Sequence, residues 1–325
     1  MTSLTLPQVT LCCVDTTPRL PWALKALQRC LGSIRFADAL LLSDAASLGD
    51  RALPPGVRWV EIEPLRSIEA YSAFVLKALA PHITTSHVLL VQWDGFVLNA
   101  SSWRNEFLEF DYLGAPWPNQ PPALAVGNGG FSLRSTKLLQ ALQDPALSIG
   151  HPEDVCIGQT HCVALEARGI RFPSIELARQ FSVETDSLAS RPFGFHGQWH
   201  LFQALAPDDA LALVETFDPQ VVHASHFRAL MDTLKRDARR DARLQPALAA
   251  FRSLVLRTID SGSDAWLESP EALRLCATLA ALGELDAAGQ LLSRHRAQAG
   301  RSWAEPKLWM RLQKKRLATR LGLRR

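Results

Sequence analysis

Short apolar segments alternate with segments of helical periodicity through residues 9–91, and this alternation constrains the fold more than any other feature. The apolar runs lie at 9–14, 39–42, 57–62 and 87–91, and apolar residues recur at helical spacing over 21–31 and 68–79. Strands that alternate with helices are typical of a mostly parallel sheet that is covered by helices on both faces. The sequence therefore predicts an α/β fold for this part of the chain.

The C-terminal part has a different character. After about residue 207, Ala, Leu and Arg dominate and helical periodicity replaces the strand pattern. Residues 269–298 have the pattern of a helical hairpin, with Ser269 or Ser263 as a cap, Pro270 in the first turn and Gly283 between the two helices. We therefore expect a first domain over 1–206 and an all-α, basic region over 207–325.

The charge also differs between the N-terminal and C-terminal parts of the chain. The net charge of +3 combines a balance of −7 over residues 1–227 with a balance of +10 over residues 228–325. No nucleic-acid motif accompanies the basic part, so we expect no nucleic-acid partner. No run approaches the roughly 18–20 apolar residues of a membrane span, and Met1–Pro7 lacks the pattern of a secretion signal. The sequence predicts a cytoplasmic protein.

The six cysteines form no CxxC pair. Buried free cysteines pack as small hydrophobic side chains. Cys12 and Cys13 lie inside an apolar run, where neighbouring side chains point to opposite faces of a strand. This pattern favours buried thiols over a zinc site or a disulfide framework.

Polar side chains follow three of the predicted strands at the point where each strand ends. Asp15 and Thr16 follow the first strand, Asp44 follows the second, and Gln92 and Asp94 follow the fourth. In open α/β sheets, ligands bind at the carboxyl ends of the strands. These residues are therefore candidates for binding a nucleotide, and Asp94 could hold a divalent cation on a phosphate. The alternative for Asp94 is an ordinary turn former.

A glycine-rich segment, Gly127–Gly130, precedes an arginine at the predicted start of a helix over 135–142. Glycines permit a close approach to the backbone, so the N–H groups of Asn128, Gly129 and Gly130, with Arg134, could hold a phosphate or sugar hydroxyls. The alternative is a glycine-rich turn beside a surface arginine.

Two acidic residues and a histidine complete the candidates. Glu153 and Asp154 could supply a general base, because the repulsion between paired carboxylates raises one pKa. Alternatively, they favour the dipole of a helix whose first turn they occupy. His196 could bind the same metal as Asp94, or it could be an ordinary loop residue between glycines.

The order of these segments resembles the DUF5672 family, which is regarded as glycosyltransferase-like with a GT-A fold. The resemblance covers roughly residues 9–200, and its most specific parts are the blocks around Asp94 and Asn128. It implies a GT-A-like mixed sheet with helices on both faces. It also implies that Asp94 matches the Asp-x-Asp signature, although Phe96 stands where a second Asp would lie. Under the same resemblance, His196 completes the metal site.

The resemblance further implies the activity and the site roles. A sugar would move from a UDP- or GDP-linked donor to a hydroxyl of a glycan or lipid-linked acceptor, in bacterial surface polysaccharide synthesis. We expect Asp154 to be the base, with Glu153 orienting it. A cation (Mn²⁺ or Mg²⁺) on Asp94 and His196, or Arg and Lys side chains alone, would neutralise the departing diphosphate. The alternative is a catalytically silent glycan- or nucleotide-binding module with a helical docking tail.

The last residues of the chain, 311–325, combine leucines with many basic side chains. Such a segment is typical of an amphipathic helix that lies on anionic lipid, and it would bring the protein to the inner face of the membrane. The alternative is a solvated helix end with cations near its C-terminus.

Overall fold

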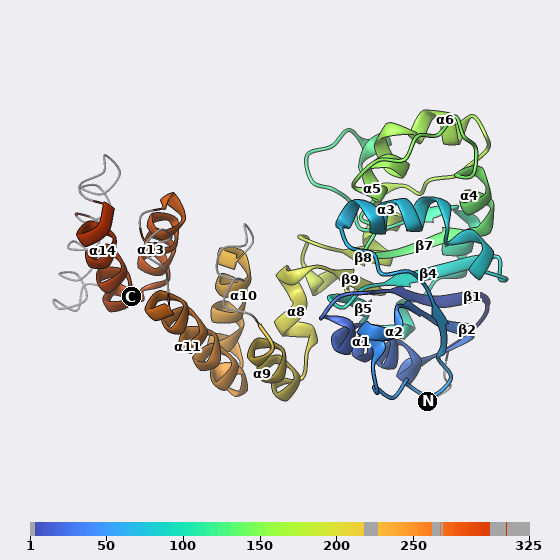
Figure 1. The fold of residues 1–325 in the computed structure, drawn as a ribbon. Coiled ribbons are helices and arrows are strands. Elements are labelled where there is room, and N and C mark those ends of the chain that lie inside the picture. Colours follow the sequence, from blue (N-terminus) through green and yellow to red (C-terminus); the bar gives the residue numbers. More distant parts are fainter. Residues whose placement is uncertain (1–3, 218–226, 262–266, 268, 300–309, 311–325) are drawn as a thin grey trace. The chain divides into compact units, whose positions relative to one another are not determined.

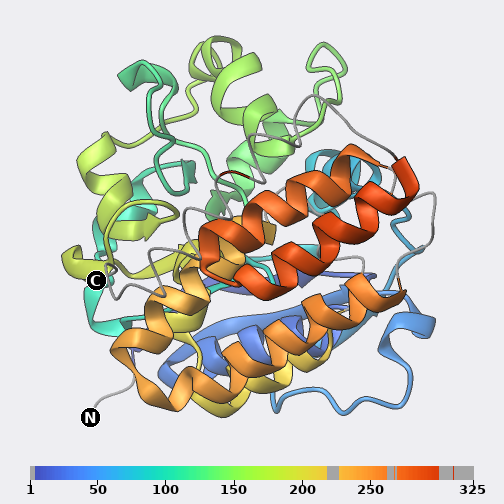
Figure 2. The same cartoon turned by 90° about the vertical axis from the view of Figure 1, so that its left-hand side faces the viewer.

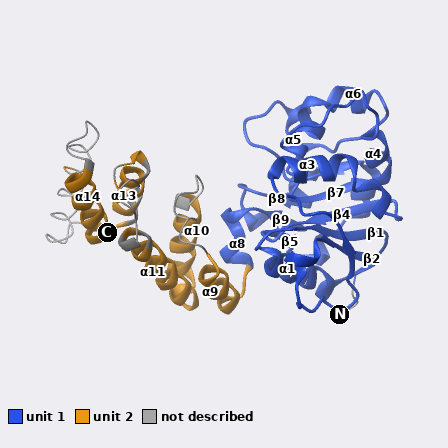
Figure 3. Cartoon of the chain, viewed as in Figure 1, with its two compact units in different colours: residues 1–204 blue, residues 205–325 orange. Residues whose placement is uncertain are grey.

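The computed structural model describes residues 4–217, 227–261, 267, 269–299 and 310 (Figure 1). The chain divides into two compact units, Met1–Ala204 and Leu205–Arg325 (Figure 3). The boundary lies two residues before the one that the composition suggests. The assignment of these parts to functional domains stays a prediction.

The first unit is built on a six-stranded sheet in the order β3-β2-β1-β4-β7-β6. Its strands are β1 (Leu4–Val14), β2 (Ile34–Ser43), β3 (Arg58–Glu61), β4 (His87–Val91), β6 (Tyr112–Leu113) and β7 (Phe131–Ser135). The first four are mutually parallel, whereas β7 runs antiparallel to both β4 and β6. Because β7 is reversed, its beginning lies at the same edge of the sheet as the end of β4.

Helices cover both faces of this sheet. On one face, α3 (Ile68–Lys77) packs Val75 against Cys12 of β1 and Leu90 of β4. On the other face lies α1 (Leu20–Ser33), which is buried along the side that contacts β1, β2 and β4 (Figure 1). The shorter helices are α2 (Ala45–Leu48), α4 (Thr136–Ala141), α5 (Glu153–Val155), α6 (Cys162–Glu166), α7 (Ile175–Phe181) and α8 (Gln198–Ala204). A π-helical turn, Cys156–Thr160, joins α5 to α6.

A second, smaller sheet brings a distant segment to the edge where β4 ends. It has the order β5-β9-β8, with β5 (Gly95–Val97), β8 (Ser182–Val183) and β9 (Gly194–His196). In the antiparallel pair of β5 and β9, Gly95 lies opposite His196. The register of this sheet therefore places His196 beside the residues that follow β4.

The second unit is helical in all its described elements. It contains α9 (Pro207–Glu215), α10 (Phe227–Arg240), α11 (Gln245–Ser261), α13 (Pro270–Leu282) and α14 (Leu285–Ala299), with a 3₁₀ turn at Ala242–Leu244. The predicted hairpin is present: Ser269 Oγ accepts a hydrogen bond from Ala272 N (3.4 Å), and Gly283 ends α13 with φ +87°. The helices α13 and α14 lie side by side (Figure 2). The predicted fold class, a mixed α/β sheet followed by an all-α region, is confirmed.

Two further expectations concern the whole chain. All six cysteines are free and buried, as predicted. None of the described helices combines the length and the apolar character that a membrane span requires. The basic segment 311–325 lies outside the described residues.

Candidate active site

The polar residues that follow β1 and β2 lie at one edge of the sheet. Their side chains already accept hydrogen bonds from backbone N–H groups of the protein. Asp15 Oδ1 accepts a hydrogen bond from Thr17 N (2.7 Å), and burial raises the pKa of Asp15. The Thr16 hydroxyl accepts a bond from the backbone N–H of Leu65 (2.9 Å). Asp44 caps α2 through Oδ2, which accepts from Ser47 N (3.0 Å). Their expected contact with a nucleotide stays a prediction.

Asp94 and His196 form a close pair, although they come from different segments. His196 Nε2 lies 3.4 Å from Asp94 Oδ1, and both side chains are largely buried. Burial alone would raise the pKa of Asp94, but the charges of His196 and Arg19 outweigh it and hold that pKa below its ordinary value. Conversely, burial alone would lower the pKa of His196, and the charge of Asp94 raises it. The two groups stabilise each other's charged forms.

Glycines make room for this imidazole. A Cβ atom on Gly130 would lie 2.1 Å from His196 Nε2, and a Cβ atom on Gly95 would lie 3.0 Å from the Cδ2 atom of the same ring. Real Cβ atoms essentially never approach heavy atoms to within 3 Å, so a side chain at position 130 would displace His196. Close packing explains these two glycines, without any need for a positive φ.

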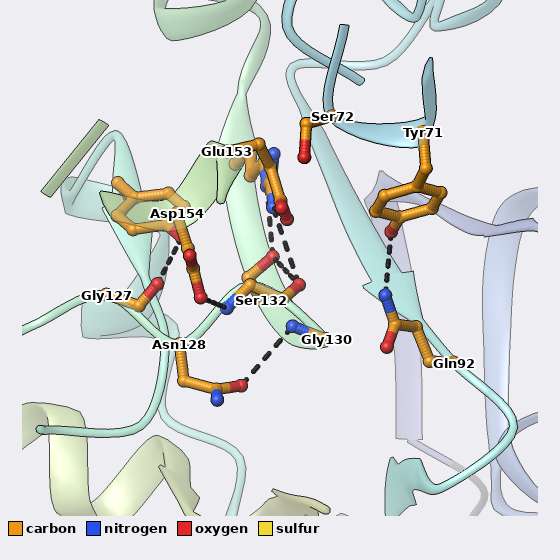
Figure 4. Close-up of polar contacts among 12 residues, drawn as sticks. Tyr71, Ser72, Gln92, Gly127, Asn128, Gly130, Ser132, Glu153 and Asp154 are labelled. Atoms are coloured by element: carbon orange, nitrogen blue, oxygen red, sulfur yellow. Dashed lines mark hydrogen bonds and ion pairs between the residues drawn. The ribbon is translucent and has the colours of Figure 1, made fainter. Parts of the chain in front are cut away.

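Besides Asp94, the polar side chain that contacts His196 is Gln92, and residue 96 does not take this place. Gln92 Oε1 lies 3.2 Å from His196 Nε2, and Gln92 Nε2 donates to the Tyr71 hydroxyl (2.8 Å) (Figure 4). Phe96, which occupies the expected position of a second Asp, is 3% exposed and packs edge-on against Phe195 at 4.9 Å. The guanidinium of Arg29 lies over the Phe96 ring at 4.8 Å, so this side chain has a packing role.

The acidic pair lies beside the glycine-rich segment, at the start of α5. Asp154 Oδ2 accepts a hydrogen bond from Gly129 N (3.0 Å), and Oδ1 accepts one from Val155 N (2.8 Å). Burial, followed by the charge of Glu153, raises the pKa of Asp154. Asp154 is only partly buried, whereas Glu153 is 6% exposed. Of the two carboxylates, Asp154 is therefore the one that can reach a ligand.

Glu153 is held by Arg134 in a buried ion pair. Arg134 Nη2 lies 3.1 Å from Glu153 Oε1, its Nε donates to Ser132 Oγ (3.0 Å), and its guanidinium lies over the Tyr112 ring at 5.3 Å. Arg134 belongs to strand β7, and helix α4 begins only after the cap at Ser135. From the sequence, we expect Arg134 at the start of a helix and in contact with a sugar-nucleotide donor. In the structure, Arg134 is fully buried and forms an ion pair with Glu153.

The backbone N–H groups of the glycine-rich segment are likewise engaged within the protein. Gly129 N donates to Asp154, and Gly130 N donates to Asn128 Oδ1 (3.3 Å). A Cβ atom on Gly129 would lie 2.3 Å from Glu153 Oε1. Gly129 thus contacts the acidic pair while Gly130 contacts His196. Two consecutive glycines join the two candidate centres.

The site could hold a divalent cation, but with few protein ligands. Among the described residues, no three His, Cys, Asp or Glu side chains converge, so Asp94 and His196 form a two-residue set. Asp94 Oδ1 is buried and has no hydrogen-bond partner within the described part of the chain. Mg²⁺ is commonly held by one or two carboxylates, with substrate phosphates supplying further oxygens. A buried carboxylate oxygen that makes no hydrogen bond and lies 3.4 Å from an imidazole nitrogen suits that chemistry.

Comparisons with known proteins bear on this region. Residues 56–196 match the family described as "Protein of unknown function (DUF5672)". The resemblance to DUF5672 is thereby confirmed for this segment, which contains both candidate centres. A search of curated protein sequences gave no match. Among the solved structures that match is the crystal structure of S. aureus TarS 1-349, with a TM-score of 0.34 and 11% identity over 90% of each chain.

Sequence reasoning missed the residues that support the site. Tyr71 lies on α3 and orients Gln92, while Ser132 lies on β7 and contacts Arg134. Ser72 Oγ contacts His151 Nδ1 at 2.9 Å and so links α3 to the loop before α5. The helical spacing over 68–79 predicts α3, but which side chains of the helix reach the site depends on how α3 packs.

Proposed function

We propose that this protein is a glycosyltransferase, which moves a sugar from a UDP- or GDP-linked donor to a hydroxyl of a glycan or lipid-linked acceptor. The observation that carries the proposal is the junction at Gly129 and Gly130. There the partly exposed carboxylate of Asp154 lies on one side and the Asp94–His196 pair lies on the other. Glycosyl transfer to a hydroxyl needs a base for the acceptor and a place for the charged leaving group, and this junction offers both.

Asp154 is the proposed general base. Proton transfer by a positioned side chain contributes roughly 10²–10⁴-fold to a rate. The hydrogen bond from Gly129 N fixes the carboxylate, and its raised pKa makes it a stronger base than an ordinary aspartate. Glu153 keeps its place through Arg134 and contributes the negative charge that helps to raise the pKa of Asp154.

Asp94 and His196 are the proposed holders of the leaving diphosphate, through Mn²⁺ or Mg²⁺. When bound, such a cation stabilises the negative charge that develops on the phosphate oxygens. Asp15, Thr16 and Asp44 would face the nucleotide from the ends of β1 and β2. The amide nitrogen of Asn128 points away from Gly130 and would meet a sugar hydroxyl (Figure 4).

A donor screen tests the proposal directly. The protein is incubated with a panel of UDP- and GDP-sugars, and release of the nucleoside diphosphate is measured with and without candidate glycan acceptors. We expect one donor to be consumed, with slow hydrolysis even when no acceptor is present. Binding of a donor without hydrolysis or transfer would instead support the alternative of a silent binding module.

The base assignment predicts that Asp154→Asn lowers the transfer rate by about 10²–10⁴-fold, with little effect on nucleotide affinity measured by calorimetry. Asp50→Asn, at an exposed position, is the matched control and should keep the wild-type rate. In the wild type, the rate should fall as the pH drops through the pKa of Asp154, which lies above the ordinary value for Asp of about 3.9. An Asp154→Asn variant that turns over like the wild type would show that another group is the base.

A further inference from the structure

Two oxygen atoms approach the same nitrogen of His196. Gln92 Oε1 lies 3.2 Å from His196 Nε2, and Asp94 Oδ1 lies 3.4 Å from it. Gln92 and Asp94 are two residues apart, directly after β4, whereas His196 comes from β9. Three polar groups from two distant segments therefore converge on one point at the edge of the main sheet.

His196 Nε2 cannot donate a good hydrogen bond to both oxygen atoms. A ring nitrogen of His carries at most one hydrogen, so Nε2 can donate to Gln92 or to Asp94 but cannot serve both well. Asp94 Oδ1 is buried and makes no hydrogen bond among the described residues, so that its polar contact is the ion pair with His196 at 3.4 Å. A buried carboxylate oxygen without a hydrogen bond is costly, and a bound cation would satisfy it.

Tyr71 fixes the direction of the Gln92 amide. The amide nitrogen of Gln92 donates to the Tyr71 hydroxyl at 2.8 Å (Figure 4). This bond leaves Oε1 for His196, whose Nε2 lies 3.2 Å away. Carboxamide and carboxylate oxygens and imidazole nitrogens all occur as ligands of divalent metals. For a small cation with ligands at about 2.1 Å and right angles, neighbouring donor atoms lie about 3 Å apart. The two observed separations are close to that spacing.

We infer that Gln92 Oε1, oriented by Tyr71, is the third protein ligand of a divalent-cation site with Asp94 and His196. The inference extends the cation site of the proposed function. With a neutral amide in place of a second carboxylate, the site carries one formal negative charge, from Asp94. The free protein should therefore bind the cation weakly, and a diphosphate that brings its own negative oxygens should strengthen the binding.

The test measures Mn²⁺ alone, without nucleotide or acceptor, by electron paramagnetic resonance titration of free Mn²⁺. Gln92→Glu keeps the shape of the side chain and adds a negative charge. If residue 92 is a ligand, this variant should bind Mn²⁺ about tenfold more tightly or better. Gln92→Leu should bind several-fold more weakly than the wild type. Gln120→Glu, at an exposed position, adds the same charge elsewhere and should leave the affinity unchanged.

The opposite result has a different physical cause. If Gln92 serves only to accept a hydrogen bond from His196, a glutamate at position 92 would hold the imidazole in its charged form, and Mn²⁺ would bind no more tightly than to the wild type. That result, in a variant whose circular dichroism spectrum matches the wild type, overturns the inference. Tyr71→Phe, which frees the amide to rotate, should weaken Mn²⁺ binding less than Gln92→Leu does.

Cation binding and glycosyl transfer can fail separately. Tighter binding of Mn²⁺ by Gln92→Glu, together with no turnover of any donor by the wild type, would support the cation site and reject the glycosyltransferase. Turnover that is equal with Mn²⁺ and with EDTA, together with unchanged Mn²⁺ binding by Gln92→Glu, would support the transferase and reject the site.

Discussion

At the scale of single residues, the candidate site depends on two glycines as much as on its charged side chains. Gly129 and Gly130 have no Cβ atom, and this allows the Glu153 carboxylate and the His196 ring to approach the same stretch of backbone. The charged residues then pair in two separate ways. Arg134 neutralises Glu153 in the interior, whereas Asp94 faces His196. Asp154 is left as the partly exposed carboxylate.

The buried ion pair leads to a prediction about stability. Glu153→Gln would leave the guanidinium of Arg134, whose side chain is 0% exposed, without a negative partner. Removing one partner of a buried pair typically lowers the free energy of unfolding by about 3–5 kcal/mol. Urea denaturation followed by circular dichroism measures the change. Glu106→Gln is the control, because Glu106 pairs with Arg104 at the surface and its loss should change the stability little. Equal effects of the two substitutions would contradict this role of Glu153.

At the scale of elements, short segments around the sheet position the site. The reversed direction of β7 brings the glycine-rich segment to the end of β4, and the pairing of β5 with β9 brings in His196. Helix α3 contributes Tyr71 and Ser72 from one face of the sheet. The sequence predicts α3 well, because apolar residues recur at helical spacing over 68–79. It does not predict β9, since three residues between glycines and prolines carry little strand signal.

The cap of α3 can be tested by substitution. Ser67 Oγ accepts a hydrogen bond from Ala70 N at 3.1 Å. Ser67→Ala should lower the free energy of unfolding by about 1 kcal/mol, because it leaves a backbone N–H of the first turn without its partner. Thermal unfolding compares this variant with Ser101→Ala, which alters an exposed serine of a 3₁₀ turn and should have almost no effect. A loss of the same size in both variants would mean that the cap contributes nothing specific.

At the scale of the whole molecule, the charge asymmetry follows the two units only in part. Counted by unit, residues 1–204 carry −3 and residues 205–325 carry +6. The contrast is smaller than the one seen when the chain is divided at residue 227, because acidic residues of α9 belong to the helical unit. The basic character is therefore concentrated toward the C-terminal end of the second unit.

This concentration suggests contact with an anionic membrane surface, which we propose as the role of the basic segment 311–325. Deleting residues 306–325 should abolish co-sedimentation with vesicles that contain anionic lipid, since each basic side chain near such a surface contributes about 1 kcal/mol. Vesicles of zwitterionic lipid are the control and should bind neither chain. Undiminished binding of the shortened chain to anionic vesicles would refute the role of this segment.

The sequence by itself determined the class of fold and the burial of the cysteines. These features follow from local apolar patterns, which report how much of each segment is buried. Only the tertiary structure decided which side chains share the site. Gln92 and His196 are 104 residues apart, and Phe96 packs against the ring of Phe195 while Gln92 contacts the imidazole. Such pairings depend on how distant segments pack, and no local pattern contains that information.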